Sequence, residues 1–347
     1  MIVDSNTFPP QTTYSTGGIG PSALAVADLN GDNKPDIVIS NFGSNNVGVL
    51  LNDNSGRFLS PVTYSVDVYP NFVTIADVNS DDKFDLLVSN MGSNSVSVLL
   101  NNGDGSFLSQ IIYTTEGNPS TLCAADVNND NRLDLIVVNS ASNDIGVLLN
   151  AGNGTFLPQT TYLVGLNPTA AAVGDLNNDS LPDIIIANSY SNNIGILFNG
   201  DNGTFLPQIT YFANLYPFAM TIADVNNDGQ LDIAVTNYNL NNISVLLNNG
   251  DGTFASLDTY PSGTNPNSIS VLDLNNDGSS DIVVTNENSN NIGIFLNTGN
   301  GTFLPQITYP AGSVPKSVKM VDVNNNGKLD IIVINVGDGN VGVFLQN

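Results

Sequence analysis

The chain has 347 residues, of which 32 are acidic, 7 are basic and none is histidine, so its formal charge is -25. This charge argues against nucleic acid and anionic membranes as partners, because both are bound through Lys and Arg, and it points to cations instead. An apolar content of 41% excludes a disordered acidic tail, and the single cysteine excludes an intramolecular disulfide framework and a cysteine-based zinc cluster.

The N-terminal segment lacks the features of a secretion signal. The first residues, MIVDSNTF, have neither a basic region nor an apolar core, so either the sequence is a mature or excised domain or export is not encoded in it. Residues 7–14, TFPPQTTY, match TFLPQTTY at 155–162 and TFLPQITY at 204–211. No run along the chain approaches the roughly 18 apolar residues of a membrane span, so we expect no membrane insertion.

A nine-residue acidic motif recurs along the chain at a constant spacing. It reads D-x-N-x-[D/N]-x-x-x-D and begins every 49 residues, seven times in all. Seven such units account for 343 of the 347 positions, so we expect one domain over residues 1–347, without a linker.

Each unit has the same order of apolar runs, as the second unit illustrates. Its runs are residues 72–78, 85–90, 95–101 and 107–113, and a Gly/Asn/Asp turn at 102–106 separates the last two. Short runs rich in Val, Ile and Leu between turn residues predict four β-strands per unit, about 28 in all. No stripe of helical periodicity is long enough for a helix. The pattern predicts an all-β, seven-bladed β-propeller with four antiparallel strands per blade.

The two ends of the chain favour a closed ring over an open β-solenoid. Residues 7–14 resemble a fourth strand without the three that should precede it, and residues 341–347 resemble a third strand with no fourth after it. The N-terminal strand can therefore complete the last blade. An open stack would leave two bare sheet edges, which favour aggregation.

The acidic motif has the ligand spacing of a loop that binds a hard cation. Oxygen side chains at positions 1, 3 and 5, a backbone carbonyl at 7 and a carboxylate at 9 supply the oxygens that Ca²⁺ prefers, whereas Mg²⁺ demands a stricter octahedron. Position 7 shares no side-chain chemistry among the units, so only its carbonyl can be the ligand. Position 6 holds Gly, Asn, Asp or Ser, and all but Ser180 are residue types that tolerate positive φ.

We therefore predict up to seven bound Ca²⁺ ions, held by five residues in each unit. The position 1 ligands are Asp28, Asp77, Asp126, Asp175, Asp224, Asp273 and Asp322; those of position 3 are Asn30, Asn79, Asn128, Asn177, Asn226, Asn275 and Asn324. Position 5 holds Asp32, Asp81, Asp130, Asp179, Asp228, Asp277 and Asn326, and position 7 holds Lys34, Lys83, Arg132, Leu181, Gln230, Ser279 and Lys328. Position 9 holds Asp36, Asp85, Asp134, Asp183, Asp232, Asp281 and Asp330.

Two other interpretations of the motif are less favourable. An EF-hand would need a Glu at position 12, where every unit has Val or Ile in a predicted strand. Asp, Asn and Gly also form ordinary turns, but a turn does not require Asp at positions 1 and 9 in all seven units. The seventh unit has Asn326 at position 5 and should bind most weakly. The motif uses 20 of the 32 acidic residues.

The motif resembles the FG-GAP/VCBS repeat family, whose best-known relatives form the integrin α-subunit head. The match rests on Asp224–Asp232 and its six counterparts, and Asn41-Phe42-Gly43-Ser44 is similar to the Phe-Gly element of the family. The Gly-Ala-Pro element of integrins is absent, which indicates the bacterial-type VCBS branch. The resemblance implies an extracellular or cell-surface, calcium-dependent adhesion or recognition module. The family also includes lectins and the propeller domains of some lyases and phospholipases.

A ligand site is expected on the face formed by the 2–3 and 4–1 connections, because the units differ most there. The calcium loops and the 3–4 turns should share the opposite face. Candidate ligand-binding residues from the fourth and fifth blades are Tyr190, Phe212, Leu215, Tyr216 and Tyr238, which could instead pack between blades. The expected ligand is a protein or a glycan, and the chain is expected to be a monomer.

Two alternatives remain open. The first is a propeller enzyme acting on a polysaccharide through the only two glutamates, Glu116 and Glu287, but no nucleophile and base stand together in the sequence, so we expect no enzyme. The second is a recently duplicated repeat scaffold without a ligand. Near-identical segments, such as residues 202–211 and 300–309, favour that duplication. Cys123 lies in an apolar run and is expected to be a buried, inert thiol.

Overall fold

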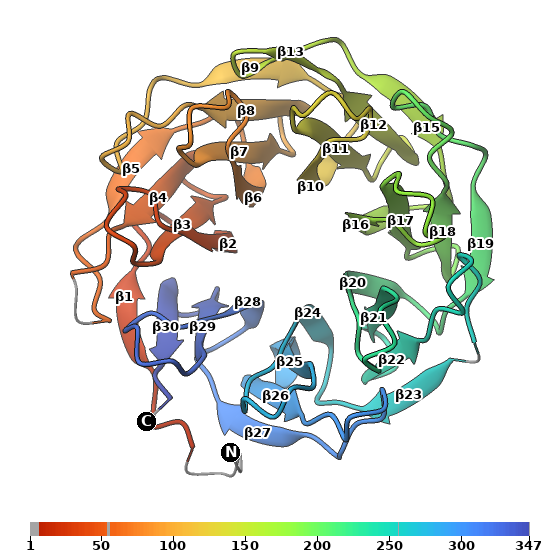
Figure 1. The fold of residues 1–347 in the computed structure, drawn as a ribbon. Coiled ribbons are helices and arrows are strands. Elements are labelled where there is room, and N and C mark those ends of the chain that lie inside the picture. Colours follow the sequence, from red (N-terminus) through yellow and green to blue (C-terminus); the bar gives the residue numbers. More distant parts are fainter. Residues whose placement is uncertain (1–6, 54–55, 256, 347) are drawn as a thin grey trace.

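The structure is a computed structural model that describes residues 7–53, 56–255 and 257–346. Within these residues the chain forms seven four-stranded antiparallel sheets and one additional two-stranded hairpin. The sheets stand around a central axis as the blades of a propeller (Figure 1). The prediction of an all-β, seven-bladed propeller is confirmed.

Each blade runs from an inner strand at the axis to an outer strand at the rim. Blade 1 comprises β2 (Pro21–Ala27), β3 (Asp36–Asn41), β4 (Asn46–Leu50) and β5 (Val62–Ser65); blade 2 comprises β6 (Pro70–Ala76), β7 (Asp85–Asn90), β8 (Ser95–Leu99) and β9 (Ile111–Thr114). Blade 3 comprises β10 (Pro119–Ala125), β11 (Asp134–Asn139), β12 (Asp144–Leu148) and β15 (Thr160–Leu163), with the small hairpin β13 (Asn150–Gly152) and β14 (Thr155–Phe156) between its last two strands.

The remaining blades follow the same order. Blade 4 comprises β16 (Pro168–Gly174), β17 (Asp183–Asn188), β18 (Asn193–Leu197) and β19 (Ile209–Phe212); blade 5 comprises β20 (Pro217–Ala223), β21 (Asp232–Asn237), β22 (Asn242–Leu246) and β23 (Asp258–Pro261). Blade 6 comprises β24 (Pro266–Leu272), β25 (Asp281–Asn286), β26 (Asn291–Phe295) and β27 (Ile307–Pro310); blade 7 comprises β28 (Pro315–Val321), β29 (Asp330–Asn335), β30 (Asn340–Phe344) and β1 (Thr12–Ser15). In the described part of the chain, the only helical element is the short 3-10 helix η1 (Glu287–Ser289).

The N-terminal strand closes the ring. β1 pairs antiparallel with β30, with Thr12 opposite Val343 and Ser15 opposite Asn340. Figure 1 shows the first and last strands side by side in one blade. The strand covers residues 12–15 rather than the expected 7–14, because Phe8 leaves the sheet and packs edge-on against Tyr309, with ring centroids 5.3 Å apart.

The fourth strands are shorter than predicted. In blade 2 the predicted strand 107–113 is replaced by β9, which begins at Ile111. Phe107 forms only an isolated bridge with Asn101, and its ring packs edge-on against Tyr64 of blade 1 at 5.3 Å. The chain therefore reaches across to the neighbouring blade before it joins its own sheet.

The hydrophobic core is divided into seven clusters, each shared by two neighbouring blades. One cluster, for example, joins Val38 and Val49 of blade 1 to Leu86 and Val88 of blade 2. The second strand of every blade is wholly buried, since neighbouring blades cover both of its faces. Each Å² of apolar surface removed from water stabilises a fold by roughly 25 cal/mol. Apolar contact between blades is therefore the main force that holds the ring together. No helix in the described ranges is long and apolar enough to cross a membrane.

An edge-on pair of aromatic rings also joins each blade to the next. Each pair combines a Tyr from the outer strand of one blade with a Phe from the 3–4 connection of the following blade. Together they use seven of the 11 tyrosines. The other four are Tyr69, Tyr190, Tyr216 and Tyr238, all in 2–3 or 4–1 connections.

Candidate functional site

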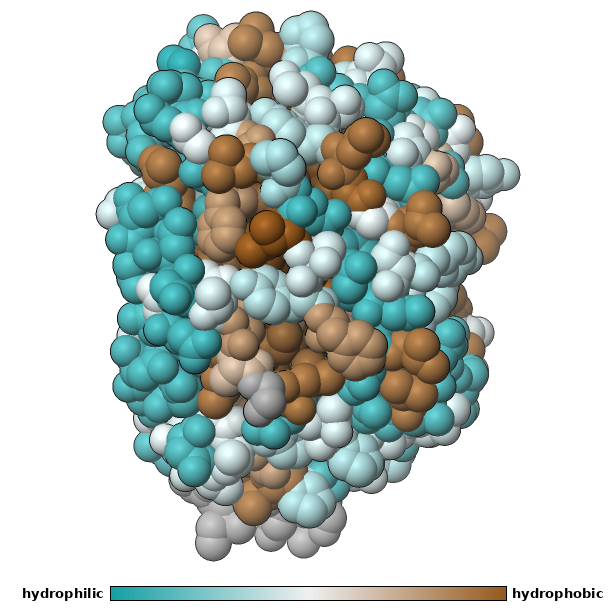
Figure 2. All heavy atoms as spheres, turned by 90° about the vertical axis from the view of Figure 1, so that its right-hand side faces the viewer, coloured by the Kyte–Doolittle hydropathy of each residue, from teal (hydrophilic) through white to brown (hydrophobic). Residues whose placement is uncertain are grey.

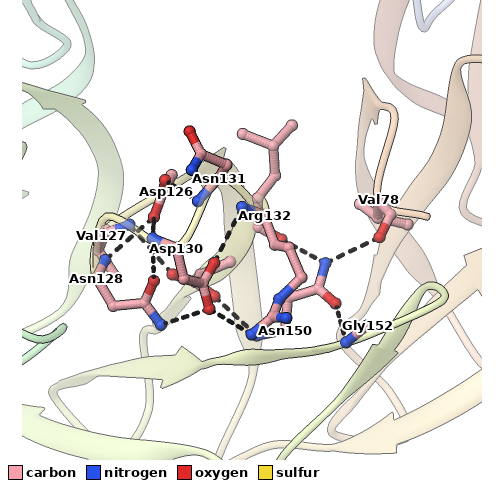
Figure 3. Close-up of polar contacts among 11 residues, drawn as sticks. Val78, Asp126, Val127, Asn128, Asp130, Asn131, Arg132, Asn150 and Gly152 are labelled. Carbon is pink, nitrogen blue, oxygen red and sulfur yellow. Dashed lines mark hydrogen bonds and ion pairs between the residues drawn. The ribbon is translucent and has the colours of Figure 1, made fainter. Parts of the chain in front are cut away.

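The acidic loops fold around their position 1 carboxylates, as the third repeat shows (Figure 3). Oδ1 of Asp126 accepts hydrogen bonds from the backbone N–H of Asn128 at 3.3 Å and of Asp130 at 3.1 Å, and Oδ2 accepts one from Asn131 at 2.7 Å. Nδ2 of Asn128 donates to Oδ2 of Asp130 at 3.1 Å. The oxygen side chains of positions 1, 3 and 5 therefore gather around a single turn.

The position 9 carboxylate joins the loop to the blade. Oδ2 of Asp134 accepts from the N–H of Val127 at 3.1 Å, and Oδ1 accepts from the N–H of Asn150 at 2.7 Å. The same two bonds recur in all seven repeats. Burial raises the pKa of five of these carboxyls to about 6, although the N–H donors by themselves would lower it. The five carboxyls belong to Asp36, Asp85, Asp183, Asp281 and Asp330.

A buried amide just after each third strand fixes the loop of the preceding blade, and this residue was not predicted from the sequence. Nδ2 of Asn150 donates to the carbonyl oxygens of Val78 at 2.8 Å and of Leu133 at 2.9 Å, while its Oδ1 accepts from the N–H of Gly152 at 2.8 Å (Figure 3). Val78 directly follows the position 1 Asp of the second repeat. The feature of the sequence that could have indicated this role is a polar residue just after each third strand. It is Asn in six repeats and Gln346 in the last.

The loop oxygens have the chemistry that a hard cation requires. Among the described residues, no group of three or more Asp, Glu, His or Cys side chains converges into a cation cluster. The carboxylates at positions 1 and 9 accept backbone N–H groups instead. Two position 5 carboxylates form ion pairs with the basic residue at position 7: Asp81 with Lys83 at 3.3 Å, and Asp130 with Arg132. The chemistry of the donors fits Ca²⁺, and the set of ligands stays a prediction.

The 2–3 and 4–1 connections lie together on one face, as expected. In each blade the residue after the second strand donates its N–H to the carbonyl of the residue that precedes the inner strand; one such bond joins Tyr238 to Tyr216 at 3.1 Å. Lys83 of a 1–2 loop and Gly103 of a 3–4 hairpin are close neighbours on the other side. The two faces thus carry different functional candidates.

An aromatic cluster stands on this face, at blades 4 and 5. Tyr216 is the centre: its ring centroid lies 5.7 Å from Tyr190, 6.3 Å from Phe218 and 6.1 Å from Tyr238. Phe218 and Tyr238 are 5.3 Å apart. Tyr190 is 62% exposed, so the cluster reaches the surface. We call these four residues the aromatic cluster.

The structure brings together some of the candidate ligand residues and leaves others apart. Phe218, at the start of the inner strand β20, belongs to the cluster although it was not predicted. Phe212 and Leu215 are 73% and 53% exposed, but within the described ranges no ring contact joins Phe212 to the cluster. Phe212 ends the outer strand β19, and Figure 2 shows scattered hydrophobic patches on the side of the ring where β15 and β19 lie.

Polar contacts extend the cluster toward blade 6. The Tyr190 hydroxyl interacts with that of Tyr216, and burial together with this contact raises the pKa of Tyr216. Burial raises the pKa of Tyr238, and the negative charge of the nearby Glu287 carboxylate raises it further. Glu287 in turn accepts a hydrogen bond from Nδ2 of Asn267 at 2.6 Å. Glu116, the other glutamate, lies in the turn before β10 of blade 3, far along the ring from this network.

Fold and loops define a class: a seven-bladed β-propeller with an acidic nine-residue loop between the first two strands of every blade. The FG-GAP-like repeat profile matches residues 28–88, 77–137, 126–186, 175–235, 224–284 and 273–333. These matches span most of the chain, which therefore belongs to the FG-GAP-like repeat family.

Similar structures agree on the fold and differ in activity. Virginiamycin B lyase of Staphylococcus aureus has a TM-score of 0.70 at 15% identity, covering 97% of this chain and 99% of its own. A lectin of Agrocybe aegerita that recognises non-reducing terminal N-acetylglucosamine has a TM-score of 0.61 at 22% identity, covering 86% of this chain and 80% of its own. The periplasmic gluconolactonase of Pseudomonas aeruginosa has a TM-score of 0.64 at 16% identity, covering 87% and 88%. No curated protein sequence matches the chain.

Proposed function

We propose that the protein is a calcium-stabilised recognition module that binds a glycan over the aromatic cluster. This proposal rests on where the 11 tyrosines lie and what their rings contact. Seven of them join neighbouring blades, whereas three of the remaining four form the aromatic cluster with Phe218 on one face. Rings flanked by hydroxyl, amide and carboxylate groups offer a sugar both stacking and hydrogen bonds.

Calcium supports this role by holding the scaffold. Bound Ca²⁺ would neutralise the carboxylates of each loop, and each loop is fixed to the next blade by the buried amide, as in Asn150. We propose further that the protein acts outside the cell or at its surface, where calcium-binding modules are common. The lectin of similar fold recognises a terminal sugar, which agrees with a glycan ligand.

A polysaccharide enzyme is the second candidate. It is favoured by Glu287, whose carboxylate contacts both Tyr238 and Asn267 beside the cluster. The lyase and the gluconolactonase of similar fold are enzymes on propeller scaffolds. A glycosidase needs a second carboxyl group near the first, and the second glutamate, Glu116, lies in another blade. We therefore favour binding without turnover.

A glycan array with calcium and with EDTA tests the proposal. We expect retention of a defined set of glycans in calcium and loss of retention in EDTA. Tyr216→Ala should weaken the retained glycan by about tenfold, because the central ring of the cluster is removed. Tyr69→Ala is the matched control: Tyr69 occupies the equivalent turn of blade 2, also has positive φ, and stacks on Phe42 outside the cluster. No retention by a folded, calcium-loaded protein would contradict glycan binding, and release of shorter products would favour the enzyme.

A further inference from the structure

A cavity of about 610 Å³ lies on the propeller axis. The inner strands of all seven blades line it: β2, β6, β10, β16, β20, β24 and β28. This volume is in the range of sites that hold small ligands. The cavity also meets the aromatic cluster, because Phe218 belongs to both, and Asn267, which holds Glu287, is another lining residue.

Two lysines carry all of the charge in this cavity. Lys316 and Lys319 of β28 line it, and no Asp or Glu is among the lining residues. The other five basic residues lie elsewhere: Lys34, Lys83, Arg132 and Lys328 at loop position 7, and Arg57 in the 3–4 hairpin of blade 1. A protein with a formal charge of -25 thus has a cavity lined by two cations.

Blade 7 departs from the repeat to place these lysines. The residues equivalent to Lys316 are Ser22, Asn71, Ser120, Thr169, Phe218 and Asn267, and those equivalent to Lys319 are Ala25, Thr74, Cys123, Ala172, Thr221 and Ser270. Side chains three positions apart in a regular strand point to opposite faces. Every inner strand has a register shift just after its proline, which in β28 lies between Pro315 and Val318, and both lysines line the cavity.

Neither lysine has a carboxylate partner in the described part of the chain, where the two ion pairs belong to calcium loops. Lys316 is half-buried and Lys319 is exposed to the cavity, so both ammonium groups are accessible to a ligand. The protein around the cavity lowers the pKa of Lys319, and the thiol of Cys123 is the titratable group that interacts with it. A bound anion would supply the missing partner.

We propose that the axial cavity receives the carboxylate of an acidic glycan, bound by Lys316 and Lys319, while the sugar stacks on the aromatic cluster at its mouth. This inference rests on the proposed glycan-binding function and names the class of glycan. Phe218 connects the two parts of the site, since it contacts Tyr216 and Tyr238 on one side and lines the cavity on the other. Charge-assisted hydrogen bonds from two ammonium groups would select an acidic sugar over its neutral counterpart.

The test compares methyl β-D-glucuronide with methyl β-D-glucoside, which differ only at the carboxylate. Ligand-observed NMR titrations of the calcium-loaded full chain at low ionic strength give the two Kd values. We expect the glucuronide to bind at least about tenfold more tightly than the glucoside, and Lys316→Gln and Lys319→Gln each to weaken it by about tenfold. Arg57→Gln removes the same charge outside the cavity and should leave the Kd within about twofold.

Several outcomes separate this inference from the proposed function. A glucuronide Kd within twofold of wild type in both lysine variants, or no preference for the glucuronide in wild type, would overturn the acidic-glycan inference. If the acidic-glycan inference fails in this way, loss of glucoside binding in Tyr216→Ala would still support glycan binding over the aromatic cluster. Conversely, lysine-dependent glucuronide binding that is insensitive to Tyr216→Ala would support the anion site and contradict the aromatic face. Melting curves establish that the variants fold; we expect them to be unchanged, because Lys316 is only half-buried and Lys319 is exposed to the cavity.

Discussion

At the scale of single residues, the backbone demands positive φ at defined places in every repeat. Loop positions 4 and 6 are left-handed in all seven loops, as is the residue before the proline of each inner strand. Most of these places hold Gly or Asn, which adopt this conformation readily. The sequence predicted position 6 but not the other two, because Asn is also abundant in ordinary turns of this chain. Tyr69, Tyr216 and Val314 are exceptions, with φ of 56°, 62° and 55°, and the fold imposes this conformation at the same place in each blade.

Ser180 is the weak member of position 6, with φ 68°. Replacing it with Gly removes the clash of Cβ in the left-handed conformation, so Ser180→Gly should raise the free energy of unfolding by about 1 kcal/mol. Urea denaturation at fixed calcium measures the change. Ser280→Gly is the control, because Ser280 is not among the positive-φ residues and the same change there should be neutral or destabilising. Equal effects at both positions would argue against strain at Ser180.

At the scale of elements, the strands that could be predicted are those whose pattern is local. Residues 85–90 form β7 as expected, and β8 ends at Leu99, two residues before the predicted end. The fourth strand was placed too early because Phe107 is apolar for a non-local reason, its contact with Tyr64 of the preceding blade. Likewise, the role of Asn150 depends on a carbonyl 72 residues away, which no local pattern reveals.

Asn150→Ala tests the joint between blades 2 and 3. The substitution leaves the buried carbonyls of Val78 and Leu133 without their donor, so we expect a loss of about 2–3 kcal/mol in the free energy of unfolding. Asn102→Ala serves as the control, since this exposed amide bonds only within its own hairpin, to Ser106. Its expected cost is within about 0.5 kcal/mol. Similar losses for the two variants would show that the joint contributes nothing beyond an ordinary hairpin contact.

At the scale of the whole molecule, a constant period allowed the number of blades and the closure of the ring to be predicted. The site was predicted less completely. Tyr190, Tyr216 and Tyr238 do meet, but Phe218 and the two cavity lysines were missed. The lysines lie on an inner strand, and such residues come together only around the axis of a closed ring. Most of the negative charge comes from the loops, because 20 of the 32 acidic residues are loop Asp. Seven bound Ca²⁺ would change the formal charge from -25 to -11.

The central claim is that these loops bind calcium and that calcium stabilises the ring. At free calcium tenfold above Kd, each site contributes about 1.4 kcal/mol, so seven would contribute on the order of 10 kcal/mol. Native mass spectrometry, paired with thermal melting in calcium and in excess EDTA, measures both parts. We predict up to seven bound Ca²⁺, with the Asn326 loop filling last and Asn326→Asp removing that lag, and a large fall in Tm on chelation. A protein that binds no calcium and melts identically in EDTA would contradict the account.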